Sequence, residues 1–332
     1  MSETASMPTP PSSTQESEPP ARINKVVFVG SAAGTLAVTL WALLAPKEAE
    51  ATLATAVGYV SNWFGWFYVA LATAILVFVV FLGVSRYGRV RLGPEHSRPE
   101  FSTLSWASML FAAGIGTDLM FFAVNEPVVQ YLTPPSGQGE TVEAAREATA
   151  WTLFHYGISG WGMYALMGMA LAYFSYRMNL PLAIRSSLYP IFGKRVNGAL
   201  GHGVDMAAVV GTIFGVATSL GIGVVGLNVG LNKLFGLPQG LSTQLGLLVL
   251  AVTMATISAV SGIDKGIKRL SQLNVMLAIG LALWILVTGK TAYLLNAAVL
   301  NIGDFVRLFP DMTMQTFAYE DTGDWMSFWT LF

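Results

Sequence analysis

Long apolar stretches, separated by short polar segments, run through most of the chain. Seven of them carry at most one charged residue, and each is long enough, or nearly long enough, to cross about 30 Å of hydrocarbon as a helix. They span residues 26–44, 62–84, 101–124, 148–176, 206–231, 245–260 and 270–289. An eighth apolar stretch opens at Trp325. No alternation of apolar and polar positions competes with these runs, so the pattern predicts an all-α polytopic membrane protein and not a β-barrel.

Three segments outside the apolar stretches have patterns of their own. Residues 1–21 are rich in Ser, Pro, Thr and Glu and lack the apolar run of a signal peptide, so they predict a disordered tail. Residues 140–150 and 291–308 have apolar residues at helical spacing. These two segments predict amphipathic helices outside the membrane.

The composition narrows the class of protein further. Hydrophobic residues make up 54% of the chain and charged residues 11%, whereas soluble proteins average about 25% charged residues. This excludes a soluble enzyme and a nucleic-acid binder, and no nucleophile, base and orienting group cluster in the sequence. The chain has no cysteine, and its three histidines stand alone. We therefore expect neither a metal site nor a cofactor.

Lysine and arginine are distributed unevenly between alternate loops. The N-terminal tail and the segments 85–103, 175–205 and 261–269 hold 13 of the 18 basic residues. The positive-inside rule therefore places the N-terminus in the cytoplasm and the segment 290–324 outside.

Glycine and a carboxylate interrupt the third apolar stretch. Gly114 and Gly116 each lower helix stability by about 1 kcal/mol relative to alanine, and Asp118 follows them. Close helix packing would explain the glycines, but a lone carboxylate near the bilayer centre costs roughly 2.5–3.5 kcal/mol. The acid favours an unwound stretch facing a cavity, as in carriers with discontinuous helices. Asp118 could then face a cationic substrate or carry a proton, whereas Glu126 is interpreted as a helix-end acid near water.

Aromatic residues recur at helical spacing in the fourth stretch. At 100° per residue, Tyr156, Trp161 and Tyr164 form one face of a regular helix. An aromatic face beside a carboxylate is what a methylated ammonium group requires, because the rings attract the cation. The alternative is a packing face or an outer aromatic belt. His155 could relay protons, but a hydrogen-bonded structural histidine is the favoured interpretation.

Small polar residues gather in the fifth stretch, where Thr212, Thr218 and Ser219 lie among glycines. Hydroxyls in a transmembrane helix usually donate to the carbonyl four residues back. The alternative is contact with an ion or a substrate.

Five blocks of the sequence resemble the betaine/carnitine/choline transporters. They are residues 112–131, 154–164, 176–193, 211–223 and 261–274, in the order of that family. The resemblance implies twelve transmembrane helices with a LeuT-like core of two inverted five-helix repeats. It divides the chain into two peripheral helices (22–100), the first repeat with helices three to seven (101–290), a periplasmic amphipathic segment (291–324) and the start of helix eight (325–332). It also implies the N-terminal part of a longer protein, truncated in helix eight.

The resemblance assigns roles to individual residues. The matching residues are Tyr156, Trp161 and Tyr164 in the substrate box of helix four, and Gly114, Ile115 and Gly116 in the glycine motif of helix three. Betaine carriers of the family have glycine where Asp118 stands, because their substrate brings its own carboxylate. Choline carriers resemble this chain in carrying an acid there, so the resemblance supplies a place for the counter-ion.

The resemblance also bears on which ion, sodium or a proton, is transported together with the substrate. Sodium-coupled members offer two hydroxyls one turn apart on helix five. Thr212 matches the first, but Val216 stands at the second and has no oxygen to bind sodium. This departure favours protons, with Asp118 as the residue that carries them.

The resemblance and the residues together predict a bacterial inner-membrane carrier that takes up choline by proton symport, through alternating access, with a role in osmoprotection. Its expected partners are choline or a related quaternary ammonium compound, protons rather than sodium, and the lipid bilayer. The family implies a homotrimer, and no nucleic acid is expected. One alternative is a sodium-coupled carrier for glycine betaine or carnitine. A different class is a channel or receptor with the same cation pocket.

Overall fold

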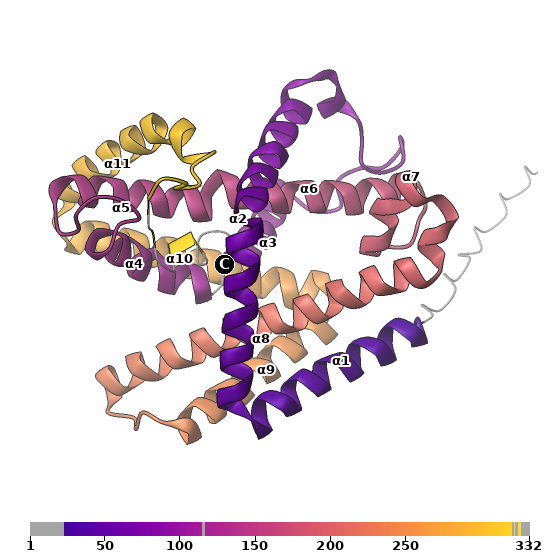
Figure 1. Ribbon diagram of the computed structural model, residues 1–332, viewed down its shortest axis with the longest axis horizontal. Helices are drawn as coiled ribbons and strands as arrows, with labels where there is room; N and C mark the ends of the chain where they lie inside the picture. Colours follow the sequence, from indigo (N-terminus) through magenta and orange to yellow (C-terminus); the bar gives the residue numbers. More distant parts are fainter. Residues whose placement is uncertain (1–22, 115–116, 321, 323–324, 327–332) are drawn as a thin grey trace, which may run out of the picture.

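The computed structural model describes residues 23–114, 117–320, 322 and 325–326, without the side chains of 113–114, 117–119 and 264–265 (Figure 1). Within these residues the chain is helical and has no strand. Its α-helices are α1 (Lys25–Leu44), α2 (Pro46–Val84), α3 (Thr103–Gly114), α4 (Thr117–Leu132), α5 (Val142–Phe154), α6 (Gly160–Ala172), α7 (Tyr189–Phe192), α8 (Ala199–Phe235), α9 (Leu241–Val260), α10 (Lys268–Thr288) and α11 (Thr291–Met312). The predicted tail, 1–21, lies outside the described residues.

Short helical turns of other kinds join several of these helices. Three are 3₁₀ turns: η1 (Arg86–Arg89), η4 (Ile184–Leu188) and η5 (Gly193–Asn197). Three are π turns: η2 (His155–Ser159), η3 (Tyr173–Arg177) and η6 (Ile263–Ile267).

Six of the described helices are long and apolar enough to cross a membrane: α1, α2, α8, α9, α10 and α11. The predicted polytopic, all-helical membrane protein is thereby confirmed. The third and fourth predicted stretches are divided between shorter helices, α3 with α4 and α5 with α6. The amphipathic helix predicted from residue 291 is present as α11, and its position outside the membrane stays a prediction.

Two helices extend beyond the stretches predicted for them. The expected loop 45–61 is instead the first part of α2, because Pro46 fits the first helical position and the alanine-rich residues after it favour helix. Helix α8 begins seven residues earlier than predicted, at Ala199, and ends where Gly236 takes a left-handed conformation with φ of 71°.

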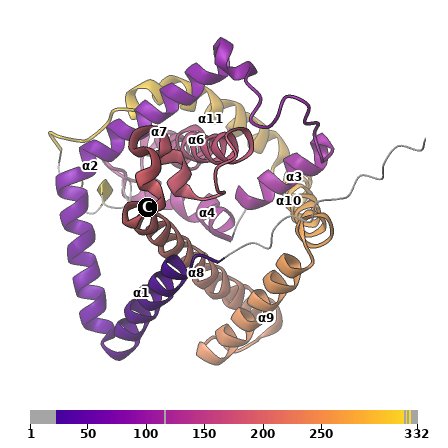
Figure 2. The ribbon, with the colours of Figure 1, turned by 90° about the vertical axis from the view of Figure 1, so that its right-hand side faces the viewer.

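Small residues let α1 lie close to α8 (Figures 1 and 2). Gly30 faces Met206, and a Cβ atom built at Gly34 would lie 4.0 Å from Val210 Cγ2. Two glycines four residues apart therefore form one side of the contact, as in closely packed membrane helices.

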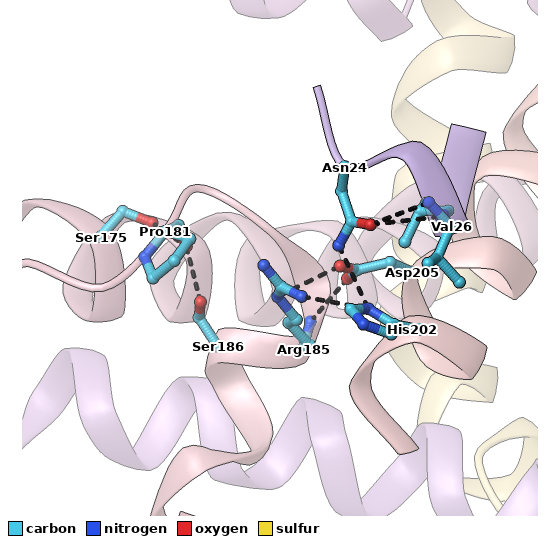
Figure 3. Close-up of polar contacts among 9 residues, drawn as sticks. Asn24, Val26, Ser175, Pro181, Arg185, Ser186, His202 and Asp205 are labelled. Atoms are coloured by element: carbon cyan, nitrogen blue, oxygen red, sulfur yellow. Dashed lines mark hydrogen bonds and ion pairs between the residues drawn. The ribbon is translucent and has the colours of Figure 1, made fainter. Parts of the chain in front are cut away.

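A polar cluster fixes the beginning of α1 to the beginning of α8 (Figure 3). The Asn24 side-chain oxygen caps α1 by accepting from the amide N–H groups of Val26 and Val27. The side-chain nitrogen of Asn24, Nδ2, lies 3.1 Å from His202 Nδ1. Arg185 of η4 pairs with Asp205 at 3.3 Å and lies 3.5 Å from the same His202 nitrogen. These four residues, the α1–α8 junction, join segments that are far apart in the sequence.

An aromatic core joins α5 to the end of α11. Its buried members are Ala150, Trp151, Phe154, Met312 and Phe317. The Arg146 guanidinium adds an ion pair to this contact, because its Nε and Nη2 atoms donate to the two Asp304 carboxylate oxygens at 2.8 and 2.5 Å. Helix α11 is thus fastened along α5, the helix that leads into the fourth stretch.

Candidate functional site

The third apolar stretch contains four of the predicted site residues. In the described structure α3 ends at Gly114 and α4 begins at Thr117. Ile115 and Gly116 lie outside the described residues, as does the side chain of Asp118. The unwound stretch and the counter-ion therefore stay predictions.

A π turn divides the fourth stretch within the predicted substrate box. Tyr156 lies in η2, where Gly157 has non-helical angles of φ −95° and ψ −130° and kinks the chain. The equal 100° spacing assumed for the three aromatic residues requires an uninterrupted helix, so it does not hold across this kink. Trp161 and Tyr164 lie together beyond it on α6, with ring centroids 5.5 Å apart.

The three predicted aromatic side chains differ in their surroundings. Trp161 is 45% exposed and Tyr164 is 69% exposed, so both rings offer a face to whatever surrounds α6. Tyr156 lies on the other side of the kink against α4, where its ring stacks on Phe122 at 5.9 Å and an interplanar angle of 25°. The His155 ring contacts Tyr156 at 4.8 Å. The structure thus pairs Trp161 with Tyr164 and holds Tyr156 with Phe122 and His155.

Phe122 was missed by the sequence reasoning, although a signal for it exists. Phe122, Glu126 and Gln130 are spaced four residues apart, and all three are buried. Residues at this spacing share one face of a helix. The same four-residue spacing in the sequence continues back to Asp118, whose side chain lies outside the described residues.

Glu126 was predicted to be a helix-end acid near water, but the structure buries it. Its side chain is only 2% exposed, because α4 continues past Pro127 to Leu132 and α5 packs beside it. His155 Nδ1 lies 3.0 and 3.2 Å from the two Glu126 carboxylate oxygens. The hydrogen-bonded histidine predicted from the sequence is confirmed, and Glu126 is its partner.

Each residue of this pair lines a cavity. One, of about 440 Å³, is bounded by Glu126 together with Phe122, Asn125, Gln130 and Trp325. Gln130 Oε1 accepts a hydrogen bond of 3.0 Å from the Trp325 indole, which closes part of that cavity. The other, of about 120 Å³, lies between α2, η2 and the end of α11 and is lined by residues that include Tyr68, Thr73, His155, Ser159 and Met163.

Two of the three hydroxyls predicted in α8, those of Thr212 and Thr218, have the local role that the sequence favoured. Thr212 donates to the Ala208 carbonyl at 2.8 Å, and Thr218 donates to the Phe214 carbonyl at 3.0 Å. Both bonds join a residue to the carbonyl four positions earlier.

An ion pair between Arg177 of η3 and Glu95 fixes the segment that follows α2. The Arg177 guanidinium donates to the Glu95 carboxylate at 2.6 Å and to the Gly93 carbonyl at 3.2 Å. The hydrogen bond from Arg177, followed by its charge, lowers the pKa of the exposed Glu95 carboxyl below its ordinary value of 4.5.

Comparison with known proteins identifies the same family that the sequence blocks resemble. The sequence pattern of the BCCT, betaine/carnitine/choline family transporter, matches residues 26–332. The high-affinity choline transport protein of Escherichia coli K12 is 58% identical over 311 residues, which cover 94% of this chain and 46% of that protein. The osmo-dependent choline transporter BetT2 of Acinetobacter baylyi is 54% identical over 318 residues, with 96% and 46% covered.

A relative that is named for a different substrate is less similar to this chain. The glycine betaine transporter of Acinetobacter baylyi is 41% identical over 311 residues, covering 94% of this chain and 47% of the relative. All three relatives are named as transporters and not as enzymes. The chain spans about half the length of the curated relatives it matches.

Proposed function

Because the chain belongs to the betaine/carnitine/choline transporter family, we propose that its protein takes up choline across the bacterial inner membrane by proton symport. The observation that carries the proposal is the acid at Asp118, in a chain 58% and 54% identical to two relatives named for choline. Choline has a fixed positive charge and no carboxylate. A carboxylate on the protein is therefore the counter-ion that its binding needs.

The aromatic side chains would hold the trimethylammonium group. Trp161 and Tyr164 lie within 5.5 Å of each other, so two ring faces are available to one cation. Tyr156 would approach from the other side of the Gly157 kink, with its ring fixed by Phe122. A π turn is a common way of placing side chains at functional sites, because it changes the direction in which they leave the helix.

The architecture proposed for the whole protein is that of the family. It comprises a LeuT-like core of two inverted repeats, an N-terminus in the cytoplasm and a homotrimer. Gly114, Ile115 and Gly116 would form the unwound part of helix three, whose backbone faces the substrate. Alternating access would then expose this midplane site to each side of the membrane in turn.

Proton coupling is supported by the chemistry of α8. Val216 stands where sodium-coupled members have a second hydroxyl, and the Thr212 hydroxyl is engaged with the Ala208 carbonyl. Asp118 is the proposed proton carrier. Choline in the site would favour its charged form, and a buried empty site would favour its neutral form.

Uptake of labelled choline by the full-length protein, with and without sodium across a pH series, tests the proposal. We expect saturable accumulation that needs no sodium and follows the proton gradient. The 41% identical glycine betaine transporter makes a zwitterion carrier the second candidate. A strict sodium requirement, or a preference for betaine over choline, would select that candidate instead.

A further inference from the structure

We propose that Glu126 and His155 form a second proton-binding site, distinct from Asp118, through which the coupled proton passes on its way into the carrier. This inference rests on the proposed proton symport and extends it to residues that substrate binding does not use. The pair joins α4 to η2, two segments whose facing positions are 29 residues apart in the sequence.

The geometry of the pair suits the binding of a proton. The Glu126 carboxylate is almost fully buried, and both of its oxygens lie within hydrogen-bonding distance of His155 Nδ1. A carboxylate in this position fixes the ring orientation and makes Nδ1 the nitrogen that donates. The second ring nitrogen, Nε2, is then the atom on which an additional proton is taken up.

The change in charge gives the pair a reason to bind and release a proton. With a neutral imidazole the pair carries a net charge of −1, and with an imidazolium its net charge is zero. Burying a net charge in a dry interior costs free energy, whereas the same charge beside water is solvated. Proton binding therefore changes the net charge that the carrier encloses when it closes around the pair.

Each residue of the pair lines a cavity. Glu126 lines the cavity of about 440 Å³, and His155 lines the cavity of about 120 Å³. A water molecule occupies about 30 Å³ in the liquid, so each cavity has room for more than one. The smaller cavity also contains the buried hydroxyl of Ser159, for which the described residues provide no hydrogen-bond partner.

Few other ionisable groups face the pair. Among the described residues that line the two cavities, the remaining titratable side chain is Tyr68 of α2. Tyr156 contacts the His155 ring from η2 itself. Glu147 lies about two helical turns before His155, on α5. Helix α8 packs on α4, and its residues 206–232 include no ionisable side chain. Asp118 lies about two turns before Glu126 on α4, and its side chain is outside the described residues.

Ring contacts connect the proton pair to the proposed substrate box. The His155 ring touches Tyr156, and Tyr156 stacks on Phe122, which lies one helical turn from Glu126. A movement of either partner when the proton binds would thus be passed to Tyr156. This arrangement gives the pair a way to act on the substrate site without touching the substrate.

Two transport assays on the reconstituted full-length protein test the proposal. Accumulation driven by a proton gradient needs net proton movement, whereas choline exchange across vesicles with choline on both sides needs only binding and the conformational cycle. Glu126→Gln and His155→Gln should lower proton-driven accumulation by at least about ten-fold and flatten its pH profile. Both variants should retain exchange within about three-fold of the wild type.

Two further variants guard against misfolding and unspecific effects. Glu126→Asp keeps an ionisable carboxylate and should recover much of the proton-driven accumulation. Glu143→Gln removes an exposed acid from α5 and should change neither assay. An unchanged pH profile in Glu126→Gln would overturn the proposal, and so would equal loss of exchange and accumulation in all three variants of the pair. If the wild type itself needs sodium and ignores pH, the proposed function fails, whatever these variants do.

Discussion

Asp118 stands as the one charged residue in the apolar stretch 101–124. In the full-length protein, Asp118→Asn keeps the shape of the side chain and removes its charge and its proton. We predict a steep fall in choline affinity, because the Coulomb attraction at about 4 Å is near 4 kcal/mol at an effective dielectric of 20, before desolvation is subtracted. Choline binding titrations and the pH profile of uptake measure the two roles separately.

The outcomes at Asp118 separate the two roles. Lost affinity with an unchanged pH profile would leave a counter-ion that carries no proton. Asp118→Gly should tilt the preference toward betaine, whose own carboxylate would no longer meet a buried negative charge. Unchanged choline uptake in Asp118→Asn would reject both roles.

Trp161 tests whether the box acts through its ring faces. Trp161→Ala should weaken choline binding by about 1–2 kcal/mol, roughly ten-fold, because it removes a π surface near the cation. Trp161→Phe keeps an aromatic face and should weaken binding less. Equilibrium binding to the purified full-length protein is the measurement, and equal affinities for the two variants would place the box elsewhere.

At the residue scale, the sequence predicted that a side chain forms a hydrogen bond better than it predicted the partner in that bond. The hydrogen bond of His155 was predicted, but its partner was not, because a contact between residues 29 positions apart leaves no local pattern. Glu126 was placed near water because it lies at the end of an apolar stretch. The structure buries it because the helix continues beyond the apolar run and a second segment covers it.

The ion pair between Arg146 and Asp304 joins two elements, α5 and α11. The Asp304 side chain is 3% exposed and that of Arg146 is 45% exposed, so the pair is only partly screened by solvent. Asp304→Asn should lower the free energy of unfolding by about 1–3 kcal/mol, since it removes the charge-assisted bonds and leaves the guanidinium without its carboxylate partner. The midpoint of thermal unfolding in detergent measures this change.

A charge exchange provides the control for that pair. The double variant Arg146→Asp with Asp304→Arg should be more stable than the sum of its single variants implies. Additive effects of the two single changes would show that the ion pair contributes nothing to the packing of α11.

The Glu95–Arg177 pair predicts a pH-dependent contact between the segment after α2 and η3. Because the folded pKa of Glu95 is lowered, its contribution to stability is present above the ordinary value of 4.5 and is lost as the pH falls through the folded pKa. A nitroxide label at Arg98→Cys should therefore become more mobile as the pH is lowered from 4.5 through the folded pKa of Glu95. Adding Glu95→Gln should give high mobility at every pH in that range, and a titration that survives this change would exclude Glu95 as its source.

At the element scale the apolar pattern located the helices but not their interruptions. Five of the six membrane-length helices, α1, α2, α8, α9 and α10, contain stretches that hydropathy alone predicted as spans, because crossing the lipid requires about 20 apolar residues in succession. The sixth, α11, was predicted as an amphipathic helix outside the membrane. The kink at Gly157 was not predicted, because a π turn contains the same residue types as the helix around it. The glycines of the fourth stretch show where such a turn is permitted, and tertiary contacts decide where it forms.

For the molecule as a whole, the relatives are about twice as long as the chain. We predict that residues 1–332 alone, reconstituted in vesicles, do not accumulate choline. Carriers with inverted repeats bind their substrate between the repeats and move one against the other, and the resemblance to the family predicts that this chain contains one of the two repeats. Counting labelled choline inside vesicles that contain only this chain, beside vesicles with the full-length protein, checks the prediction. Saturable accumulation by the chain alone would contradict it.

The α1–α8 junction has a consequence for the time course of synthesis. Asn24 and His202 are 178 residues apart, and a ribosome adds about 5–20 residues per second. Roughly 10–40 s therefore pass between the emergence of α1 and that of the helix against which it docks. During this interval the face with Gly30 and the buried Ser31 has α2 as its available neighbour. Helix α1 is thus fastened to α8 only after this delay, and an insertion factor has that interval in which to occupy the same face.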